Sequence, residues 1–240
     1  MSRSRVLAVI PARYGSTRFP GKPLAEIRGI PMIVRVYRRA SMLGGVDRVL
    51  VATDDIRIKE AVERDGGTAV MTSRAHLTGT SRVREVALGH RYGIVLNLQG
   101  DEPVLPVGGV ERLIEAMRAA PRVVMGTLAA WETDRRELER PDVVKVVCDR
   151  AGNALYFSRS AIPHGAGKTL RHIGVYAYRR SFLLKFTSLP HGPLERHESL
   201  EQLRALENGF GIRVVCCRAG SAGVDRPADI KRVEKWLESR

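Results

Sequence analysis

The chain has 240 residues, enough for one large α/β domain or for one domain with a modest insertion. Hydrophobic residues make up 44% and charged residues 28% of the sequence, proportions that exclude a fibrous or disordered chain. The 40 Lys and Arg residues exceed the 26 Asp and Glu residues and give a formal charge of +14, which suits anionic ligands. Because these basic residues are spread along the chain without a basic arm, we expect no nucleic-acid partner.

Apolar runs in this sequence are short. None reaches the length needed to cross a membrane, and residues 6–10 run straight into Pro11-Ala12-Arg13, unlike a secretory signal. The three cysteines show neither CxxC nor metal-binding spacing. We therefore expect a cytoplasmic protein without a membrane partner.

Strand-like and helix-like segments alternate through the first half of the chain. Strands are predicted at residues 6–10, 48–53, 68–71 and 94–98, and helices from Pro31 and from about residues 55 and 81. Strands separated by helices indicate right-handed βαβ crossovers. The predicted fold class is therefore α/β, with a mostly parallel central sheet flanked by helices.

Strands predominate in the next part of the chain. They are predicted at residues 122–130, 143–148, 154–158 and 173–178, with residues 149–153 forming a hairpin turn. A single helix over residues 193–207, a strand over 212–217 and a helix after Pro227 complete the chain. We predict one domain over residues 1–240, with a smaller β-rich insertion over approximately residues 131–190.

The loop after the first strand is rich in cations, hydroxyl groups and glycine. Its polar side chains are Arg13, Ser16, Thr17, Arg18 and Lys22. Ligands of open parallel sheets bind at the carboxyl ends of strands, and cations with glycine N–H groups suit a triphosphate. Five residues separate Gly15 from Gly21 and Pro23 follows Lys22, which excludes a P-loop, and no GxGxxG motif occurs.

This loop contains Ala12-Arg13, Ser16-Thr17-Arg18 and Pro20-Gly21-Lys22-Pro23-Leu24. Further segments follow in order: Val51-Ala52-Thr53-Asp54, Gly79-Thr80 with Arg82, Leu98-Gln99-Gly100-Asp101-Glu102-Pro103, Val144-Lys145-Val146-Val147, Ala154-Leu155-Tyr156-Phe157-Ser158-Arg159 with Ile162-Pro163, Arg171-His172-Ile173-Gly174-Val175-Tyr176, Leu200-Glu201-Gln202-Leu203-Arg204 and Gly223-Val224-Asp225. Together they resemble the 3-deoxy-manno-octulosonate (KDO) cytidylyltransferases, or CMP-KDO synthetases, which are Rossmann-like αβα sugar nucleotidyltransferases. The resemblance covers essentially the whole chain.

The resemblance implies transfer of CMP from CTP to the anomeric hydroxyl of KDO, with release of pyrophosphate, for lipopolysaccharide biosynthesis. It also implies Mg²⁺ as cofactor and a homodimer. The implied nucleotide-binding residues are Ala12, Arg13, Ser16, Thr17, Arg18, Lys22, Gly79, Arg82 and Gln99. The implied sugar-binding residues are Gln99, Arg159, His172, Tyr176, Glu201 and Gln202. The implied catalytic residues are Arg13, Arg18, Lys22 and Asp101, and Asp101 and Asp225 are the implied metal ligands.

Several of these residues have an ordinary structural interpretation as well. Asp101 follows a strand and can hold a hard cation, but Asp225 precedes the helix after Pro227 and can equally be a helix cap. His172, taken alone, is more typical of a structural histidine. Glu201 lies opposite the leucine face of its predicted helix, where composition indicates a solvated side chain.

The chain departs from the family pattern at two positions. Ser81 stands where the family normally has an acidic residue, and His164 where it often has an aromatic one. An 8-amino KDO analogue or a sialic-acid-like nonulosonate is therefore an alternative substrate. A nucleotide-sugar glycosyltransferase is the other alternative, although its DxD metal motif is not matched by Asp54-Asp55 or by Asp101-Glu102-Pro103.

Overall fold

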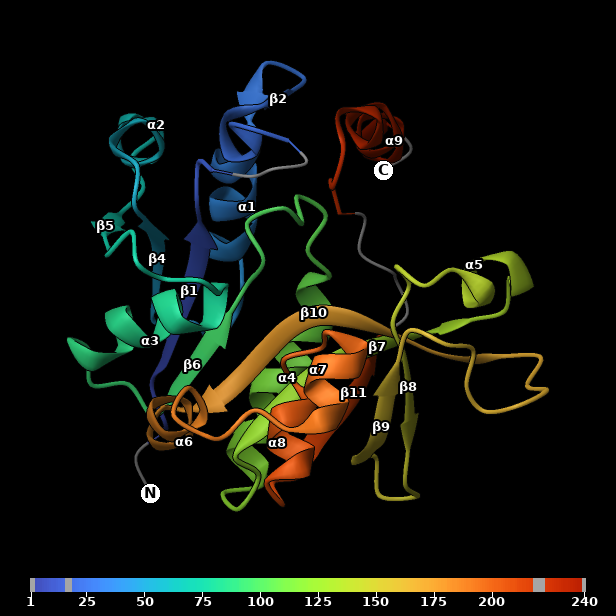
Figure 1. Cartoon of the computed structure of the whole chain (residues 1–240). Coiled ribbons are helices and arrows are strands. Elements are labelled where there is room, and N and C mark those ends of the chain that lie inside the picture. Colours follow the sequence, from blue (N-terminus) through green and yellow to red (C-terminus); the bar gives the residue numbers. More distant parts are fainter. Residues whose placement is uncertain (1–2, 16–18, 218–222, 239–240) are drawn as a thin grey trace. The chain divides into compact units, whose positions relative to one another are not determined.

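The computed structural model describes residues 3–15, 19–217 and 223–238, which form two compact bodies (Figure 1). The first body comprises residues 4–107 and returns at residues 221–240, and the second body comprises residues 108–220. Helices flank sheets that are mostly parallel in the first body, so the predicted α/β class is confirmed. None of the helices in the described part of the chain is long and apolar enough to span a membrane.

The first body is built on a parallel sheet with β1 (Val6–Ala12) inside it. β1 pairs with β6 (Ile94–Asn97) on one side and with β4 (Arg48–Thr53) on the other, and β5 (Ala69–Met71) extends the sheet beyond β4. The continuous apolar sequence of β1 is buried along almost its whole length, as expected of a strand covered on both faces. The four strands predicted for this half of the chain are therefore confirmed.

Three helices connect these strands. α1 (Met32–Ser41) and α2 (Ile56–Arg64) link β1 to β4 and β4 to β5, whereas α3 (Gly79–Leu88) leads back past β4 and β1 to β6. Right-handed crossovers that run in opposite directions place their helices on opposite faces, and Figure 1 shows α3 in front of the sheet and α1 behind it. The direction of winding reverses between β1 and β6. Ligands of doubly wound sheets bind at such a point, at the carboxyl ends of the strands.

The C-terminal segment belongs to the first body. After η1 (Lys22–Leu24), β2 (Glu26–Ile27) and β3 (Ile30–Pro31) form a hairpin whose turn residues Arg28 and Gly29 both have positive φ. The final helix α9 (Pro227–Glu238) packs on this region, where Val233 lies in one core cluster with Ile27 and Met32. This packing brings the residues just before α9 to the carboxyl edge of the sheet.

The second body contains a mixed sheet. β7 (Met125–Glu132) lies between β11 (Ile212–Cys217), which runs parallel to it, and β10 (Thr169–Arg179), which runs antiparallel. β8 (Lys145–Cys148) and β9 (Ala154–Ser158) form the predicted hairpin, and β8 also pairs with β10. The predicted insertion over residues 131–190 falls within this body, and its boundaries stay a prediction.

The helices of the second body differ from expectation. They are α4 (Val107–Ala119), α5 (Arg135–Glu139), α6 (Arg180–Phe186), α7 (Pro193–Glu198) and α8 (Leu203–Glu207). The prediction of one helix over residues 193–207 was wrong, because Ser199 adopts a left-handed conformation with φ of 51° and ends α7. α4 was not predicted, since Gly108 and Gly109 weaken the helical pattern. Gly109 is required by packing, because a Cβ there would lie 2.9 Å from Cys217 Cβ.

Candidate active site

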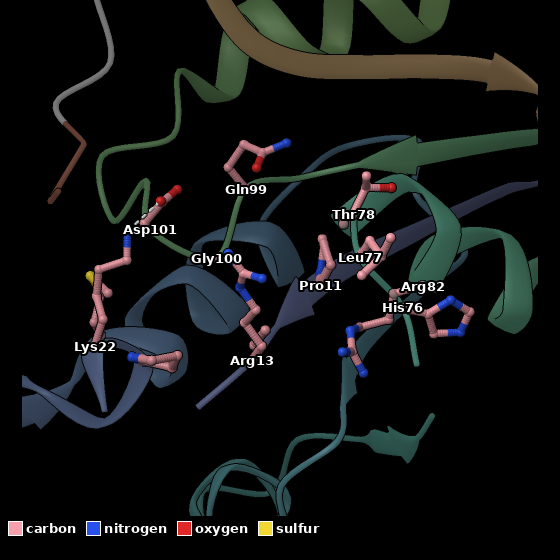
Figure 2. Close-up of a pocket in the computed structure, with 14 residues that line it drawn as sticks. Pro11, Arg13, Lys22, His76, Leu77, Thr78, Arg82, Gln99, Gly100 and Asp101 are labelled. Atoms are coloured by element: carbon pink, nitrogen blue, oxygen red, sulfur yellow. Dashed lines mark hydrogen bonds and ion pairs between the residues drawn. The ribbon is translucent and has the colours of Figure 1, made fainter. Parts of the chain in front are cut away.

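A pocket opens at the carboxyl ends of β1 and β6, where the winding of the first body reverses (Figure 2). Of the predicted nucleotide-binding residues, it is lined by Ala12, Arg13, Lys22, Gly79, Arg82 and Gln99. Asp101 lines the same pocket. Ser16, Thr17 and Arg18 were also predicted for this site but lie outside the described residues. The predicted positions that the structure describes therefore gather in one pocket of the first body.

Two glycines allow three chain segments to meet at this pocket. A Cβ on Gly100 would lie 2.8 Å from the carbonyl oxygen of Pro11, and a Cβ on Gly79 would lie 3.2 Å from Pro11 Cγ. The loop after β6 and the first turn of α3 thus both approach the end of β1 closely. Larger residues at position 100 would push Gln99 and Asp101 away from the pocket.

Lys22 joins the two predicted metal ligands. Its Nζ donates to Asp101 Oδ2 at 2.6 Å and to the carbonyl oxygen of Val224 at 3.0 Å, and it lies 3.7 Å from Asp225 Oδ1. Figure 2 shows the lysine side chain reaching up to Asp101. Asp101 and Asp225, far apart in the sequence, therefore converge on one positive charge. Lys22 was predicted for the triphosphate, and its ammonium group contacts Asp101 and lies near Asp225.

Arg82 is nearly buried, and its charge is already paired. Its Nη2 donates to Asp54 Oδ2 at 2.7 Å, and its Nη1 donates to Thr72 Oγ1 and to the carbonyl oxygen of Ser73. These bonds tie the end of β4 to the loop before α3, which lines the pocket. Asp54 belongs to the family segment found in the sequence, but no role was predicted for it. Its partner became evident only from the fold.

A further hydrogen-bonded pair of side chains fixes the same loop. Glu85, on α3, bonds to His76 Nε2 and accepts from the backbone N–H of Ser73. The hydrogen bond with His76 lowers the pKa of the Glu85 carboxyl group, so it stays ionised at neutral pH. Neither residue was predicted for the site, because a loop histidine and a helix glutamate carry no local signal of their pairing.

Ser81, which stands where the family normally has an acidic residue, forms hydrogen bonds at the start of α3. The Thr78 side chain caps α3 by accepting from the N–H of Ser81, and Ser81 Oγ donates back to the carbonyl oxygen of Thr78. The serine therefore reinforces the helix start. The backbone N–H groups of that start carry partial positive charge toward the pocket, where Thr78 and Gly79 lie.

The predicted sugar-binding residues other than Gln99 lie in the second body. Arg159, after β9, donates from Nε to the carbonyl oxygen of Glu198 at 2.7 Å and from Nη1 to that of Pro141 at 3.0 Å. Its Nη2 reaches the carbonyl oxygen of Ser199 at 3.4 Å. All three acceptors are backbone carbonyl groups, which hold the guanidinium group in place.

Glu201 and Gln202 lie in the turn between α7 and α8. Gln202 is 4% exposed, and its Nε2 makes no hydrogen bond to any residue that the structure describes. A buried donor left unsatisfied costs about 1–3 kcal/mol. Composition indicated a solvated side chain for Glu201. In the structure this side chain is half-buried, and its carboxylate lies 3.6 Å from Arg204.

His172 and Tyr176, the remaining predicted sugar-binding residues, lie together on β10. Their ring centroids are 5.4 Å apart, and His172 also meets Phe157 edge-on. Desolvation of the imidazole lowers the pKa of His172 to about 3, so the ring is neutral. The Thr127 hydroxyl donates to the carbonyl oxygen of Val175 at 2.7 Å and so accepts from His172 Nε2, which leaves Nδ1 as an acceptor.

Known proteins resemble this chain over nearly its whole length. Residues 7–215 match the cytidylyltransferase family model. A 3-deoxy-manno-octulosonate cytidylyltransferase of Syntrophotalea carbinolica is 49% identical over 245 residues, covering 97% of this chain and 98% of that protein. The enzyme of the same name from Solibacter usitatus is 46% identical and covers 98% and 95% respectively.

A solved structure agrees over the whole chain. CMP:2-keto-3-deoxy-manno-octonic acid synthetase complexed with CTP superposes with a TM-score of 0.94 at 44% identity, covering 98% of this chain and 99% of that one. The fold is thus that of a nucleotidyltransferase. The chain belongs to the 3-deoxy-manno-octulosonate cytidylyltransferase family.

Proposed function

We propose that this protein transfers CMP from CTP to the anomeric hydroxyl of KDO, giving CMP-KDO and pyrophosphate for lipopolysaccharide biosynthesis. The observation that carries this proposal is the likeness, over essentially the full chain, to a CMP-KDO synthetase solved with CTP. The single pocket that gathers the described nucleotide-binding residues supports it independently. A homodimer in the cytoplasm, where CTP is made, is part of the proposal.

CTP would lie in the pocket of the first body. Arg13, Arg18 and Lys22 would neutralise the triphosphate and the departing pyrophosphate, with Ala12, Ser16 and Thr17 contributing from the same loop. The base would lie near Gly79, Arg82 and Gln99, where backbone groups fixed by the Arg82–Asp54 pair supply hydrogen bonds. A rigid polar site of this kind rejects a purine, which leaves its groups unpaired.

Asp101 and Asp225 would hold the Mg²⁺ ion. The Lys22 ammonium group, in contact with Asp101 and 3.7 Å from Asp225, supports this assignment, since both carboxylates already face one positive charge. Mg²⁺ in proteins is usually bound by one or two carboxylates, and substrate phosphates complete its coordination. When bound, the ion would lower the pKa of the sugar hydroxyl and neutralise charge on the phosphate.

The acidic sugar would be held by residues of the second body, whereas Gln99, which was also predicted to bind the sugar, lines the pocket of the first body. Arg159 would offer its positive charge to the sugar carboxylate, while Gln202 Nε2 and His172 Nδ1 would offer a donor and an acceptor to its hydroxyl groups. Tyr176 and Glu201 would complete this set. The anomeric oxygen then attacks the α-phosphorus, the bond to pyrophosphate breaks, and the hydroxyl proton leaves to solvent.

The test is pyrophosphate release measured with each of CTP, UTP, ATP and GTP, combined with a panel of keto-sugar acids. We expect turnover with CTP and KDO, and much less with either purine nucleotide. Equal rates with ATP or GTP would contradict the proposed base site. Preference for an 8-amino analogue or a nonulosonate would favour the alternative sugars raised by Ser81 and His164. Transfer from a nucleotide-sugar to a glycan acceptor would favour a glycosyltransferase.

A further inference from the structure

Glu198, the last residue of α7, collects hydrogen bonds from the end of β9. Its carboxylate accepts from Ser158 Oγ at 2.6 Å, from the backbone N–H of Arg159 at 2.8 Å and from the Tyr156 hydroxyl at 3.4 Å. No role was assigned to it from the sequence. Three donors on one carboxylate exceed what a helix end needs, since α7 ends through its own backbone bonds.

The contact between these segments is reciprocal. The Glu198 side chain holds the backbone of Arg159, while the Arg159 side chain donates from Nε to the Glu198 carbonyl oxygen and from Nη2 to that of Ser199. The end of β9 and the end of α7 are therefore joined in both directions. These reciprocal hydrogen bonds between Arg159 and residues 198–199 are called the clasp below, and the direction of the Arg159 guanidinium group depends on them.

The same clasp fixes the turn that follows. Ser199 is held at φ 51° and ψ 46°, a conformation costly for a residue other than glycine, and the N–H of Leu200 bonds back to Glu195. Gln202, with its buried and unsatisfied Nε2, lies directly after this turn. Its position thus depends on where α7 ends.

Glu198 accepts all three bonds only when it is ionised. Burial by itself raises the pKa of Glu198, but the hydrogen bonds from Arg159, Ser158 and Tyr156 and the charge of Arg159 outweigh it, and the net pKa is lowered. The carboxylate is therefore present throughout the neutral range. A glutamine at this position has one acceptor oxygen and one donor amide, and cannot accept on both sides.

We propose that Glu198 is a positioning residue for the acidic sugar: it holds Arg159 and Gln202 in one geometry by joining β9 to the turn after α7. This role rests on the proposed function, since Arg159 and Gln202 are assigned to the sugar there. The residue itself touches neither the reacting atoms nor the nucleotide pocket. Its loss should therefore affect use of the sugar and leave the use of CTP unchanged.

The test is steady-state pyrophosphate release by Glu198→Gln, with KDO and CTP varied in turn and the melting temperature measured. We expect the KM for KDO to rise about tenfold or more, as for a lost hydrogen bond to a charged group, with the KM for CTP unchanged. Glu207→Gln is the matched control, because Glu207 also accepts two backbone N–H groups, those of Leu194 and Glu195. It should lower the melting temperature without changing the KM for KDO.

Ser158→Ala is a second variant that tests the same role if Glu198→Gln fails to fold. It removes one donor to Glu198, and we expect a smaller rise in the KM for KDO in the same direction. An unchanged KM for KDO in both variants, or an equal rise for CTP or in Glu207→Gln, would overturn the positioning role. If the wild-type protein shows no KDO-dependent turnover, the proposed function fails and this role fails with it.

Discussion

Asp101 and Asp225 both lie close to Lys22. Changing either aspartate is predicted to have a small effect on stability and a much larger effect on turnover. Each aspartate is changed to asparagine, which keeps the shape and removes the charge. Asp225 has a side chain 59% exposed and 3.7 Å from the ammonium nitrogen, so its charge contributes about 0–1 kcal/mol to stability. Asp101 is 35% exposed at 2.6 Å, and we expect about 1 kcal/mol, since Lys22 keeps its bond to Val224.

The expected effect on turnover is much larger. If both carboxylates hold one Mg²⁺ ion, each change removes an anionic ligand at the point where phosphate charge develops. One lost preorganised electrostatic group costs about 10²–10³ in turnover. The double variant should be little slower than either single variant, because ligands of one ion act as a unit.

The assay is pyrophosphate release at saturating CTP, KDO and Mg²⁺, with the melting temperature of each variant as a check on folding. Asp229→Asn is the control, because Asp229 accepts from the backbone N–H groups of Asp225 and Arg226 beside the same helix end. It should change stability more than turnover. Near-normal turnover of Asp225→Asn would refute the metal role and favour a helix cap, since asparagine caps about as well as aspartate.

Three further outcomes follow from single side chains. Lys22→Ala should raise the KM for CTP while shifting the melting temperature by only a few degrees, and unchanged kinetics would remove Lys22 from the site. Ser199→Gly should stabilise the protein by about 0.5–1 kcal/mol in denaturant unfolding, because glycine adopts positive φ without strain; a loss of stability would contradict this. The unfolded chain protonates His172 near its usual pKa of ~6.5, and the folded protein only near about 3. Stability should therefore fall as pH drops from 6.5 toward 3, and His172→Gln should reduce that fall, which unfolding at pH 7 and pH 4.5 would measure.

Local patterns in the sequence were enough to predict the strands of the first body and β11 of the second body. The strand over residues 48–53 and the strand over residues 212–217 agree with β4 and β11 in both bounds. These runs are apolar, rich in β-branched residues and bounded by turn residues, so the signal lies within a few neighbouring positions. The loop after β1 was predicted to bind phosphate from the same kind of local signal, since its cations and glycines stand in one continuous stretch, and that role stays a prediction.

Other features depended on partners distant in the sequence. The break between α7 and α8 comes where Glu198 is held by residues of β9, and a periodic pattern over residues 193–207 contains no sign of that contact. The glycines at the start of α4 weaken a helix locally, but Gly109 is required by the side chains packed against it. In both cases packing overrides the propensity of the segment.

The site shows the same division. Through its resemblance to a family, the sequence alone predicted roles for Lys22, Asp101 and Asp225. Lys22 Nζ lies 2.6 Å from Asp101 Oδ2, and it lies 3.7 Å from Asp225 Oδ1 because α9 packs against the rest of the first body. The pairing of Arg82 with Asp54 likewise depends on how α3 lies against β4. A sequence specifies which charges are available, whereas only the tertiary structure brings them within a few ångströms of one another, the range over which paired charges and hydrogen bonds act.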